Sequence, residues 1–237
     1  MKAEGAMSGN DAGGAITGWL LRAAFGTLFI GAIVFAAAGT LDWINGWVYV
    51  GWYLVVSVVS VFITDPALLA ERSNARRAKG QKGWDKALLG LYGILTPLVT
   101  PVVAGLNFRF GWPPEVAVWL QVAGFALYVL GWAIHLWAMA ANRYFALVVR
   151  IQTDRGQTVA TGGPYRYVRH PGYVGGILVS VAAALVLGSA WALIPGALGG
   201  LLLVIRTILE DRTLQRELDG YCEYAGRVRY RLLPGVW

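Results

Sequence analysis

The chain has 237 residues, of which 57% are hydrophobic and 14% are charged, and its formal net charge is +7. A soluble globular domain carries about 25% charged residues, so this composition excludes an ordinary soluble protein and favours several membrane-spanning helices. In a membrane protein Lys and Arg gather in cytoplasmic loops, so the positive charge does not indicate nucleic-acid binding.

Residues 1–16 are rich in Gly and Ala and lack the basic start and cleavage site of a signal peptide, so we predict a disordered tail. Apolar runs follow at 19–38, 47–63, 87–106, 116–141, 174–187 and 193–209. Only a short break at Gly188-Ser189 separates the last two runs, which predicts a helical hairpin. The predicted fold is therefore an all-α integral membrane protein with about six transmembrane helices. Four lie within 17–141, and the hairpin and a cytosolic tail lie within 142–237.

The basic residues predict the orientation of these helices. Segments 65–86, 142–173 and 210–237 together hold sixteen of the twenty Lys and Arg, whereas the loops predicted on the other side hold only Arg109. By the positive-inside rule, the three basic segments and both termini are cytosolic. Because the chain is also rich in Ala, Gly and Arg, we expect a bacterial cytoplasmic membrane protein.

Ionisable groups are nearly absent from the middles of the predicted helices, although a transporter usually places such groups there. His135 is the exception, and we interpret it as a packed histidine with one hydrogen bond. With Cys222 as the only cysteine and His170 as the second histidine, the chain cannot form an internal disulfide or a Cys/His metal cage. The polar groups lie instead in 142–173, at the end of the last helix and in the tail.

The segment 161–175 has features of a ligand-binding turn. Gly162, Gly163 and Pro164 predict a turn, and Pro171 is placed where a helix begins. The free N–H groups of that helix would attract an anion such as a carboxylate. Arg169 and His170 come just before it. A basic loop that contacts lipid phosphates is the alternative interpretation.

Arg206 and Glu210 are four residues apart near the end of the last predicted helix, so they share one helical face. They form either an ion pair at the membrane surface or a site in which one group binds a substrate and the other a cofactor. A glutamate facing inward at this depth is costly unless it has a cationic partner.

These elements together resemble the isoprenylcysteine carboxyl methyltransferase family and, more distantly, the phospholipid N-methyltransferases. The resemblance rests on Arg169-His170-Pro171-Gly172-Tyr173, then an apolar hairpin, then Glu210-Asp211. The tail continues the family pattern with Tyr221, Tyr224, Val228, Arg231 and Pro234. The resemblance extends from about residue 142 to 234 and is weak upstream.

The resemblance implies a membrane enzyme that uses S-adenosyl-L-methionine without a soluble Rossmann domain. By position, the cofactor site would contain Arg150, Gln157, Thr158, Val159, Ala160, Tyr165, His170, Pro171, Gly172, Tyr173 and Glu210. Arg206 matches the arginine that meets the substrate, and no metal is implied. Three positions depart from the eukaryotic members: Arg150 replaces Gln, Gln157 replaces His, and Asp211 replaces Glu.

The methyl acceptor implied is a lipophilic molecule or lipid that enters from the bilayer, most simply a carboxylate. A carboxylate is already ionised, and the sequence shows no evident base. A phospholipid amine and a small thiol remain alternative acceptors. A non-enzymatic transporter or assembly factor is the alternative of another class, and it should not bind S-adenosylhomocysteine.

Overall fold

The computed structural model describes residues 9–73 and 80–237, and the elements within them are helical. The α-helices are α1 (Gly9–Ala38), α2 (Ile44–Ile63), α3 (Pro66–Ser73), α4 (Gly83–Ile94), α5 (Thr100–Phe110), α6 (Val118–Ala141), α7 (Pro171–Val186), α8 (Leu193–Glu217) and α9 (Tyr221–Arg227). The other elements are a π-helical turn, Leu95–Val99, and two 3-10 turns, Thr153–Arg155 and Gly163–Arg166. The all-α class predicted from the sequence is confirmed for these residues.

Five helical stretches of the described residues are long and apolar enough to cross a membrane. They are Ile16–Ala38, Ile44–Ile63, Gly83–Phe110, Val118–Ala141 and Leu193–Glu217. Helix α7 is also apolar, but it has only 16 residues. A helix rises about 1.5 Å per residue, so α7 is shorter than the ~30 Å hydrocarbon core. Six crossings would require α7 as the sixth, and this number stays a prediction.

Helix α1 begins at Gly9, so the predicted disordered tail does not extend to Ile16. Adding residues to a helix that has already nucleated costs far less than starting one, and Ala12 and Ala15 are good helix formers. Residues 1–8 of that prediction lie outside the described part of the chain.

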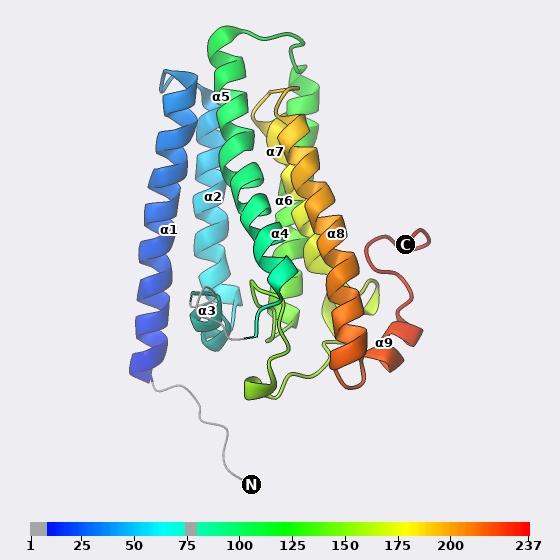
Figure 1. Ribbon diagram of the computed structural model, residues 1–237. Coiled ribbons are helices and arrows are strands. Elements are labelled where there is room, and N and C mark those ends of the chain that lie inside the picture. Colours follow the sequence, from blue (N-terminus) through cyan, green and yellow to red (C-terminus); the bar gives the residue numbers. More distant parts are fainter. Residues whose placement is uncertain (1–8, 74–79) are drawn as a thin grey trace.

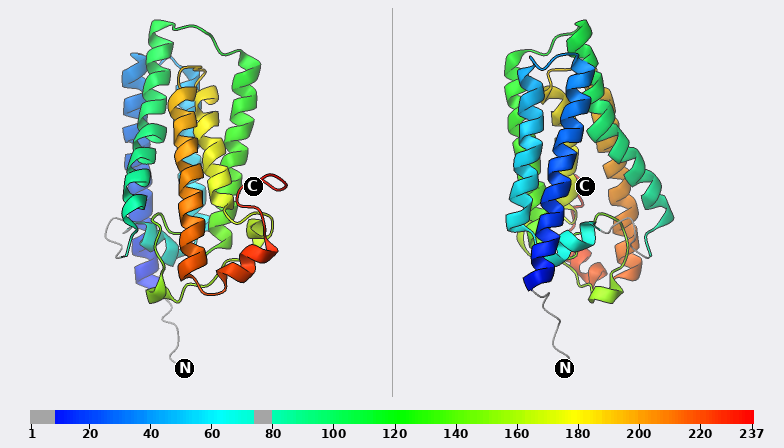
Figure 2. Two further views of the ribbon diagram at one scale, coloured as in Figure 1. Left: turned by 45° about the vertical axis from the view of Figure 1, so that its right-hand side comes forward. Right: turned by 90° about the vertical axis from the view of Figure 1, so that its left-hand side faces the viewer.

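The long helices form one bundle with two different ends (Figure 1). One end carries the short links between α1 and α2, α5 and α6, and α7 and α8. The opposite end carries the start of α1, helix α3, the segment between α6 and α7, and α9. Two further views show the same separation (Figure 2). The described parts of the basic segments therefore gather at one end of the bundle, except for the end of the C-terminal tail, which turns back along it.

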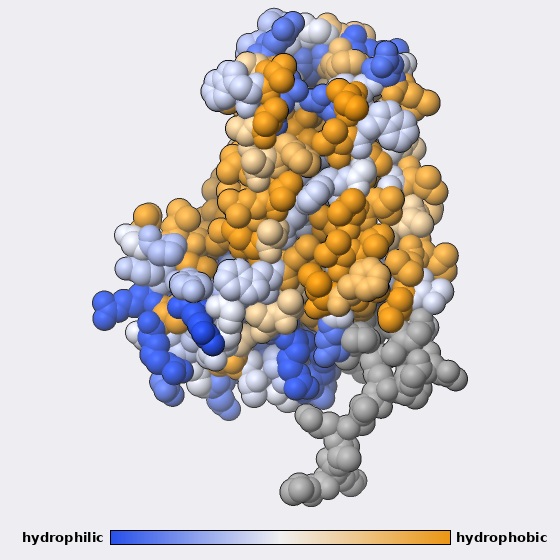
Figure 3. Space-filling view, turned by 180° about the vertical axis from the view of Figure 1, so that it is seen from behind, coloured by the Kyte–Doolittle hydropathy of each residue, from blue (hydrophilic) through white to orange (hydrophobic). Residues whose placement is uncertain are grey.

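The surface of the bundle is apolar between these ends. Seen from behind, most side chains along the middle are hydrophobic, and the polar ones gather toward the two ends (Figure 3). Phe25, Phe62 and Trp119 are among the large hydrophobic side chains exposed on the outside. An exposed apolar belt of this kind is expected where helices face hydrocarbon rather than water.

The third predicted run, 87–106, forms α4, the π turn and α5 in the structure, with Pro97 in the turn and Pro101 at the start of α5. The hydroxyl of Thr100 donates to the carbonyl oxygen of Leu95 at 3.0 Å. The backbone N–H of Thr100 donates to the same oxygen, which is the hydrogen bond of the π turn.

Small residues hold α7 tightly between α6 and α8. A Cβ atom added to Gly131 of α6 would lie 2.9 Å from the carbonyl oxygen of Gly175 on α7. A Cβ atom on Gly196 of α8 would lie 2.5 Å from the carbonyl oxygen of Ser180 on α7. Helices in a membrane gain their stability from such close packing, because lipid is as apolar as their side chains. The packing fixes the position of α7, whose first turn forms part of the cavity described next.

Candidate active site

A cavity lies where the polar end of the bundle meets its helices, and it holds about 1160 Å³ when the space at its mouth is counted. Its walls come from α3, α4, α6, α7, α8 and α9 and from the segments between α6 and α7. Eleven of the twelve residues implied by the resemblance line it: Arg150, Gln157, Thr158, Val159, Ala160, Tyr165, His170, Gly172, Tyr173, Arg206 and Glu210. Pro171 is buried at the start of α7 and does not line it.

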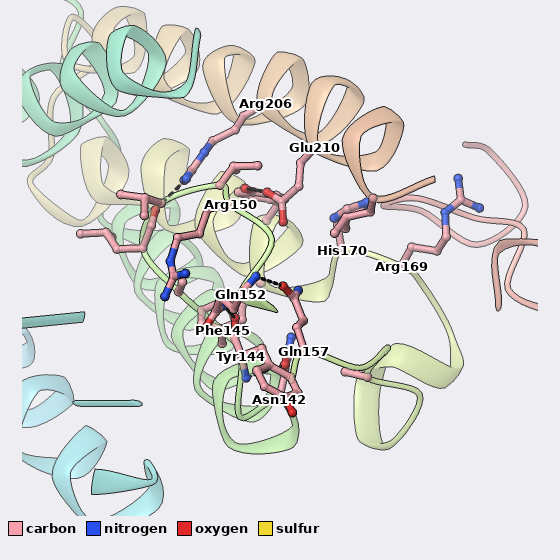
Figure 4. Close-up of a pocket in the computed structure, with 18 of the residues that line it drawn as sticks. Asn142, Tyr144, Phe145, Arg150, Gln152, Gln157, Arg169, His170, Arg206 and Glu210 are labelled. Atoms are coloured by element: carbon pink, nitrogen blue, oxygen red, sulfur yellow. Dashed lines mark hydrogen bonds between the residues drawn. The ribbon is translucent and has the colours of Figure 1, made fainter. Parts of the chain in front are cut away.

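The segment after α6 forms one wall through its own hydrogen bonds (Figure 4). The side-chain oxygen of Asn142 accepts from the Tyr144 backbone N–H at 2.9 Å, and its amide donates to the Tyr165 hydroxyl at 3.2 Å. Gln152 donates its backbone N–H to the Gln157 side-chain oxygen at 2.7 Å and its amide to the Tyr144 carbonyl at 2.8 Å. Polar side chains therefore hold this irregular segment in place where no helix does.

Arg150 already has two carboxylate partners. It donates to Glu71 at 2.9 Å and to Asp154 at 2.7 Å. Its hydrogen bond to Asp154 is the main reason that the pKa of Arg150 is raised and that of Asp154 is lowered. Since Glu71 belongs to α3, Arg150 ties the segment after α6 to that helix.

Helix α7 begins at Pro171, as the sequence predicts. The preceding His170 has φ −127° and ψ 59°, because a residue before proline avoids the helical conformation. In the first turn of α7 the N–H groups of Tyr173 and Val174 donate to the His170 carbonyl oxygen at 3.0 and 3.3 Å, and this turn meets the cavity at Gly172. The carbonyl oxygen of Gly172 lies 3.1 Å from Nδ1 of His135. His135 thus makes one hydrogen bond, and it also lines the cavity.

Arg206 and Glu210 both reach from α8 into the cavity, and no hydrogen bond joins them (Figure 4). Glu210 accepts the hydroxyl hydrogen bond of Tyr173. Arg206 donates from Nε to Asp85 at 2.7 Å and from Nη2 to the Leu147 carbonyl at 2.7 Å. Its guanidinium also lies 5.5 Å from the centre of the Tyr173 ring. The intrahelical ion pair that was one interpretation of the sequence is absent between these two described residues.

Asp85 is the partner of Arg206 that sequence analysis missed. It is fully buried, and its second oxygen accepts from the Val149 backbone N–H at 2.8 Å and from the Gln81 amide at 3.1 Å. One carboxylate therefore joins α4, α8 and the segment after α6. Asp85 lies in the first turn of an apolar helix, and this position indicates a buried partner, because an acid in a membrane helix needs one.

Asp211, the neighbour of Glu210, faces away from the cavity and is fully buried. Its oxygens accept from Arg169 at 2.8 and 3.0 Å, from Arg231 at 2.8 Å and from the Tyr221 hydroxyl at 2.9 Å. Burial would lower the pKa of Arg169, but the hydrogen bonds to Asp211 raise it instead. Asp211 therefore anchors α9 and the tail that follows it to the segment just before α7.

Tyrosines close the remaining wall as neutral hydrogen-bonding groups. The Tyr224 hydroxyl donates to the Tyr165 carbonyl at 2.7 Å, which joins α9 to the 3-10 turn Gly163–Arg166. Burial raises the pKa of both phenols, so neither ionises near neutral pH. Tyr224, one of the tail residues of the sequence pattern, therefore lines the cavity and also holds its wall in place.

Several lining residues come from parts of the chain that the sequence motifs did not indicate. Helices α3, α4 and α6 contribute side chains, so the cavity is not confined to residues 142–237. These additional residues include Arg72, Leu89, Tyr92 and His135. Within the described residues, no group of three or more His, Cys, Asp or Glu side chains is arranged to hold a metal.

Parts of the chain are similar in sequence to known proteins. Residues 119–219 match the phospholipid methyltransferase family, and this range covers α6, α7 and α8. The human protein-S-isoprenylcysteine O-methyltransferase is 27% identical over 196 residues, which cover 78% of this chain. The chain spans 64% of the length of that relative. With its apolar helices, the chain is thus similar to the phospholipid methyltransferase family and to an isoprenylcysteine methyltransferase.

Proposed function

We propose that this protein transfers a methyl group from S-adenosyl-L-methionine to a lipophilic acceptor that carries a carboxylate. The observation that carries the proposal is the position of the cavity. Polar side chains of the segment after α6 line one part of it, while Leu89, Tyr92 and Leu203 of the bundle helices line another. A water-soluble donor and a lipid acceptor can meet in such a cavity.

The donor-binding part fits the chemistry of S-adenosylmethionine. This cofactor supplies an electrophilic methyl group on a sulfonium and also carries an ammonium and a carboxylate. Glu210, oriented by the Tyr173 hydroxyl, would pair with the ammonium. The backbone N–H of Gly172, at the start of α7, would donate a hydrogen bond to the carboxylate. The buried ring of Tyr165 offers an aromatic surface for the adenosine.

The acceptor-binding part contains Arg206, one turn deeper along α8 than Glu210. Asp85 and the Leu147 carbonyl occupy its Nε and Nη2 atoms, which fixes the plane of the guanidinium. Among the described residues Nη1 has no hydrogen-bond partner, so it can donate to an acceptor oxygen and orient it toward the methyl group. Methyl transfer then depends on position and exclusion of water rather than on a base.

The match to the phospholipid methyltransferase family favours a second candidate, an acceptor with an amine. The two candidates give different products, because a methyl ester releases methanol in alkali whereas an N-methyl group does not. A thiol acceptor would also give an alkali-stable product.

Binding of S-adenosylhomocysteine to the purified protein tests the donor first. Membrane lipids are then incubated with donor carrying a labelled methyl group, and the products are treated with alkali. We expect binding and label that alkali releases as volatile methanol. Label that stays in the lipid after alkali would show that the acceptor group is an amine or a thiol rather than a carboxylate. Absence of donor binding would reject the methyltransferase in favour of a transporter or assembly factor.

A further inference from the structure

Four arginines line the cavity, and three of them have carboxylate partners among the described residues. The pairs are Arg150 with Glu71 and Asp154, Arg169 with Asp211, and Arg206 with Asp85. The fourth, Arg72, has no carboxylate partner in this part of the structure. It belongs to α3, outside residues 119–219, which match the phospholipid methyltransferase family.

Arg72 contacts the wall of the cavity only through neutral groups. Its Nη1 donates to the Phe145 carbonyl oxygen at 3.1 Å, and its guanidinium lies 5.6 Å from the centre of the Phe145 ring. Its Nε is buried and, among the described residues, has no hydrogen-bond partner. Burial and the nearby charge of Arg206 lower the pKa of Arg72 to about 10, so it stays cationic at neutral pH.

An unpaired cation at such a position is costly for the protein. A buried charge is normally paired or bound to a ligand, because removal from water costs more than neutral hydrogen bonds return. The guanidinium groups of Arg72 and Arg206 also face one cavity and repel each other. The two nearby carboxylates are engaged elsewhere, since Asp85 hydrogen-bonds to Arg206 and Glu210 to Tyr173. An anion entering the cavity would pair with Arg72 and reduce the repulsion with Arg206.

We propose that Arg72 binds the carboxylate of the acceptor. The basis is that Arg72 has no carboxylate partner among the described residues, that its Nε is buried, and that it faces the cavity beside Arg206. This inference rests on the proposed function and states which ligand Arg72 binds. The donor carboxylate has its own place at the start of α7, near Gly172. Arg72 therefore selects a lipophilic acid over a neutral or cationic lipid, and Arg206 orients the same group for methyl transfer.

The test uses the full-length protein in detergent and two pairs of probes. The first pair is N-acetyl-S-farnesylcysteine and its carboxamide, and the second is a long-chain fatty acid and its amide. S-adenosylhomocysteine reports on the donor site. The variants are Arg72→Gln and Arg72→Lys. The control is Arg109→Gln, which removes an arginine at the opposite end of the bundle, in the last turn of α5.

We expect Arg72→Gln to bind at least one acid about tenfold or more weakly, as for a lost charge-assisted hydrogen bond. Its affinities for the amides and for S-adenosylhomocysteine should match the wild type, and its ligand-free melting temperature should not fall. Arg72→Lys should recover part of the acid affinity, because the charge returns without the planar fork. Arg109→Gln should change none of these values.

Each contrary result has its own meaning. If the wild type binds S-adenosylhomocysteine but prefers neither acid to its amide, the acceptor role of Arg72 is wrong and the methyltransferase stands. If Arg72→Gln loses acid and donor affinity together, or melts at a lower temperature, Arg72 serves the donor or the structure. If the acids bind equally well to Arg72→Gln, the role is also rejected. If the wild type does not bind S-adenosylhomocysteine, the proposed function itself fails.

Discussion

Glu210 and Asp211 are adjacent on α8, yet their carboxylates have different surroundings. Glu210 lines the cavity and accepts from Tyr173, whereas Asp211 is fully buried behind it with Arg169 and Arg231. Successive residues of a helix point about 100° apart, so one acidic pair can serve two faces. Glu210 is therefore available to a ligand, and Asp211 is committed to the protein.

Replacing Glu210 with Gln keeps the shape of the side chain and its hydrogen bond to Tyr173 but removes the charge. We expect S-adenosylhomocysteine to bind roughly 1.5–3 kcal/mol more weakly, as for a lost charged hydrogen bond. Isothermal titration of the purified variant measures this change. Glu217→Gln is the matched control, because Glu217 also lies on α8 but pairs with Lys82 at the surface. Equal affinities of Glu210→Gln and the wild type would remove Glu210 from the donor site.

Asp85→Asn tests the buried pair with Arg206. Breaking such a pair from one side leaves a buried charge, so we expect a loss of about 3–5 kcal/mol in stability and a loss of turnover. Adding Arg206→Gln should restore much of the stability, because no charge is then stranded, but not the turnover. Thermal unfolding and methyl transfer of the single and double variants measure both effects. A double variant no more stable than Asp85→Asn would contradict this account of the pair.

At the scale of elements, the close crossing of α6 and α7 sets the position of the cavity wall. Gly131 and Gly175 bring the two backbones together at this crossing. Gly175→Ala should force the helices apart, displace the first turn of α7 and lower both the melting temperature and the donor affinity. Thermal unfolding and titration check this expectation.

The control for that substitution is Gly90→Ala on α4, where an added Cβ would meet nothing within 4 Å. It should leave both values unchanged or raise the melting temperature slightly, because alanine is the better helix former. Equal behaviour of the two variants would show that the contact between α6 and α7 is not tight in solution.

The sequence predicted the elements better than the contacts between them. Hydrophobic runs and the proline before α7 indicated where most helices lie, because these signals are local. The cavity residues of 142–210 could be inferred because a resemblance covers them. The partners of Asp85 and Arg72 could not be inferred, because they lie 121 and 73 residues away along the chain. Side chains that meet only after the bundle has packed leave little trace in a local pattern.

At the scale of the whole molecule, the orientation in the membrane remains a prediction that labelling can test. The single cysteine, Cys222, is exposed in α9 at the polar end of the bundle. In intact cells it should be protected from a membrane-impermeant thiol reagent, whereas Arg109→Cys in a Cys222→Ser background should react. Permeabilised cells, in which Cys222 should react, provide the control. The reverse pattern in intact cells would place the cavity mouth outside the cell.

The small-residue contacts that hold α7 between α6 and α8 also affect how fast each side of the cavity can open. Backbones packed at such distances separate only at a large cost, so this side of the cavity should be slow to open. The opposite side is held by hydrogen bonds of Asp85, Arg150 and Gln152, which can exchange one at a time. Ligands should therefore enter and leave past α3 and the segment after α6. Amide hydrogen exchange should be fast in 142–157 and slow in α7, and bound S-adenosylhomocysteine should slow mainly the former.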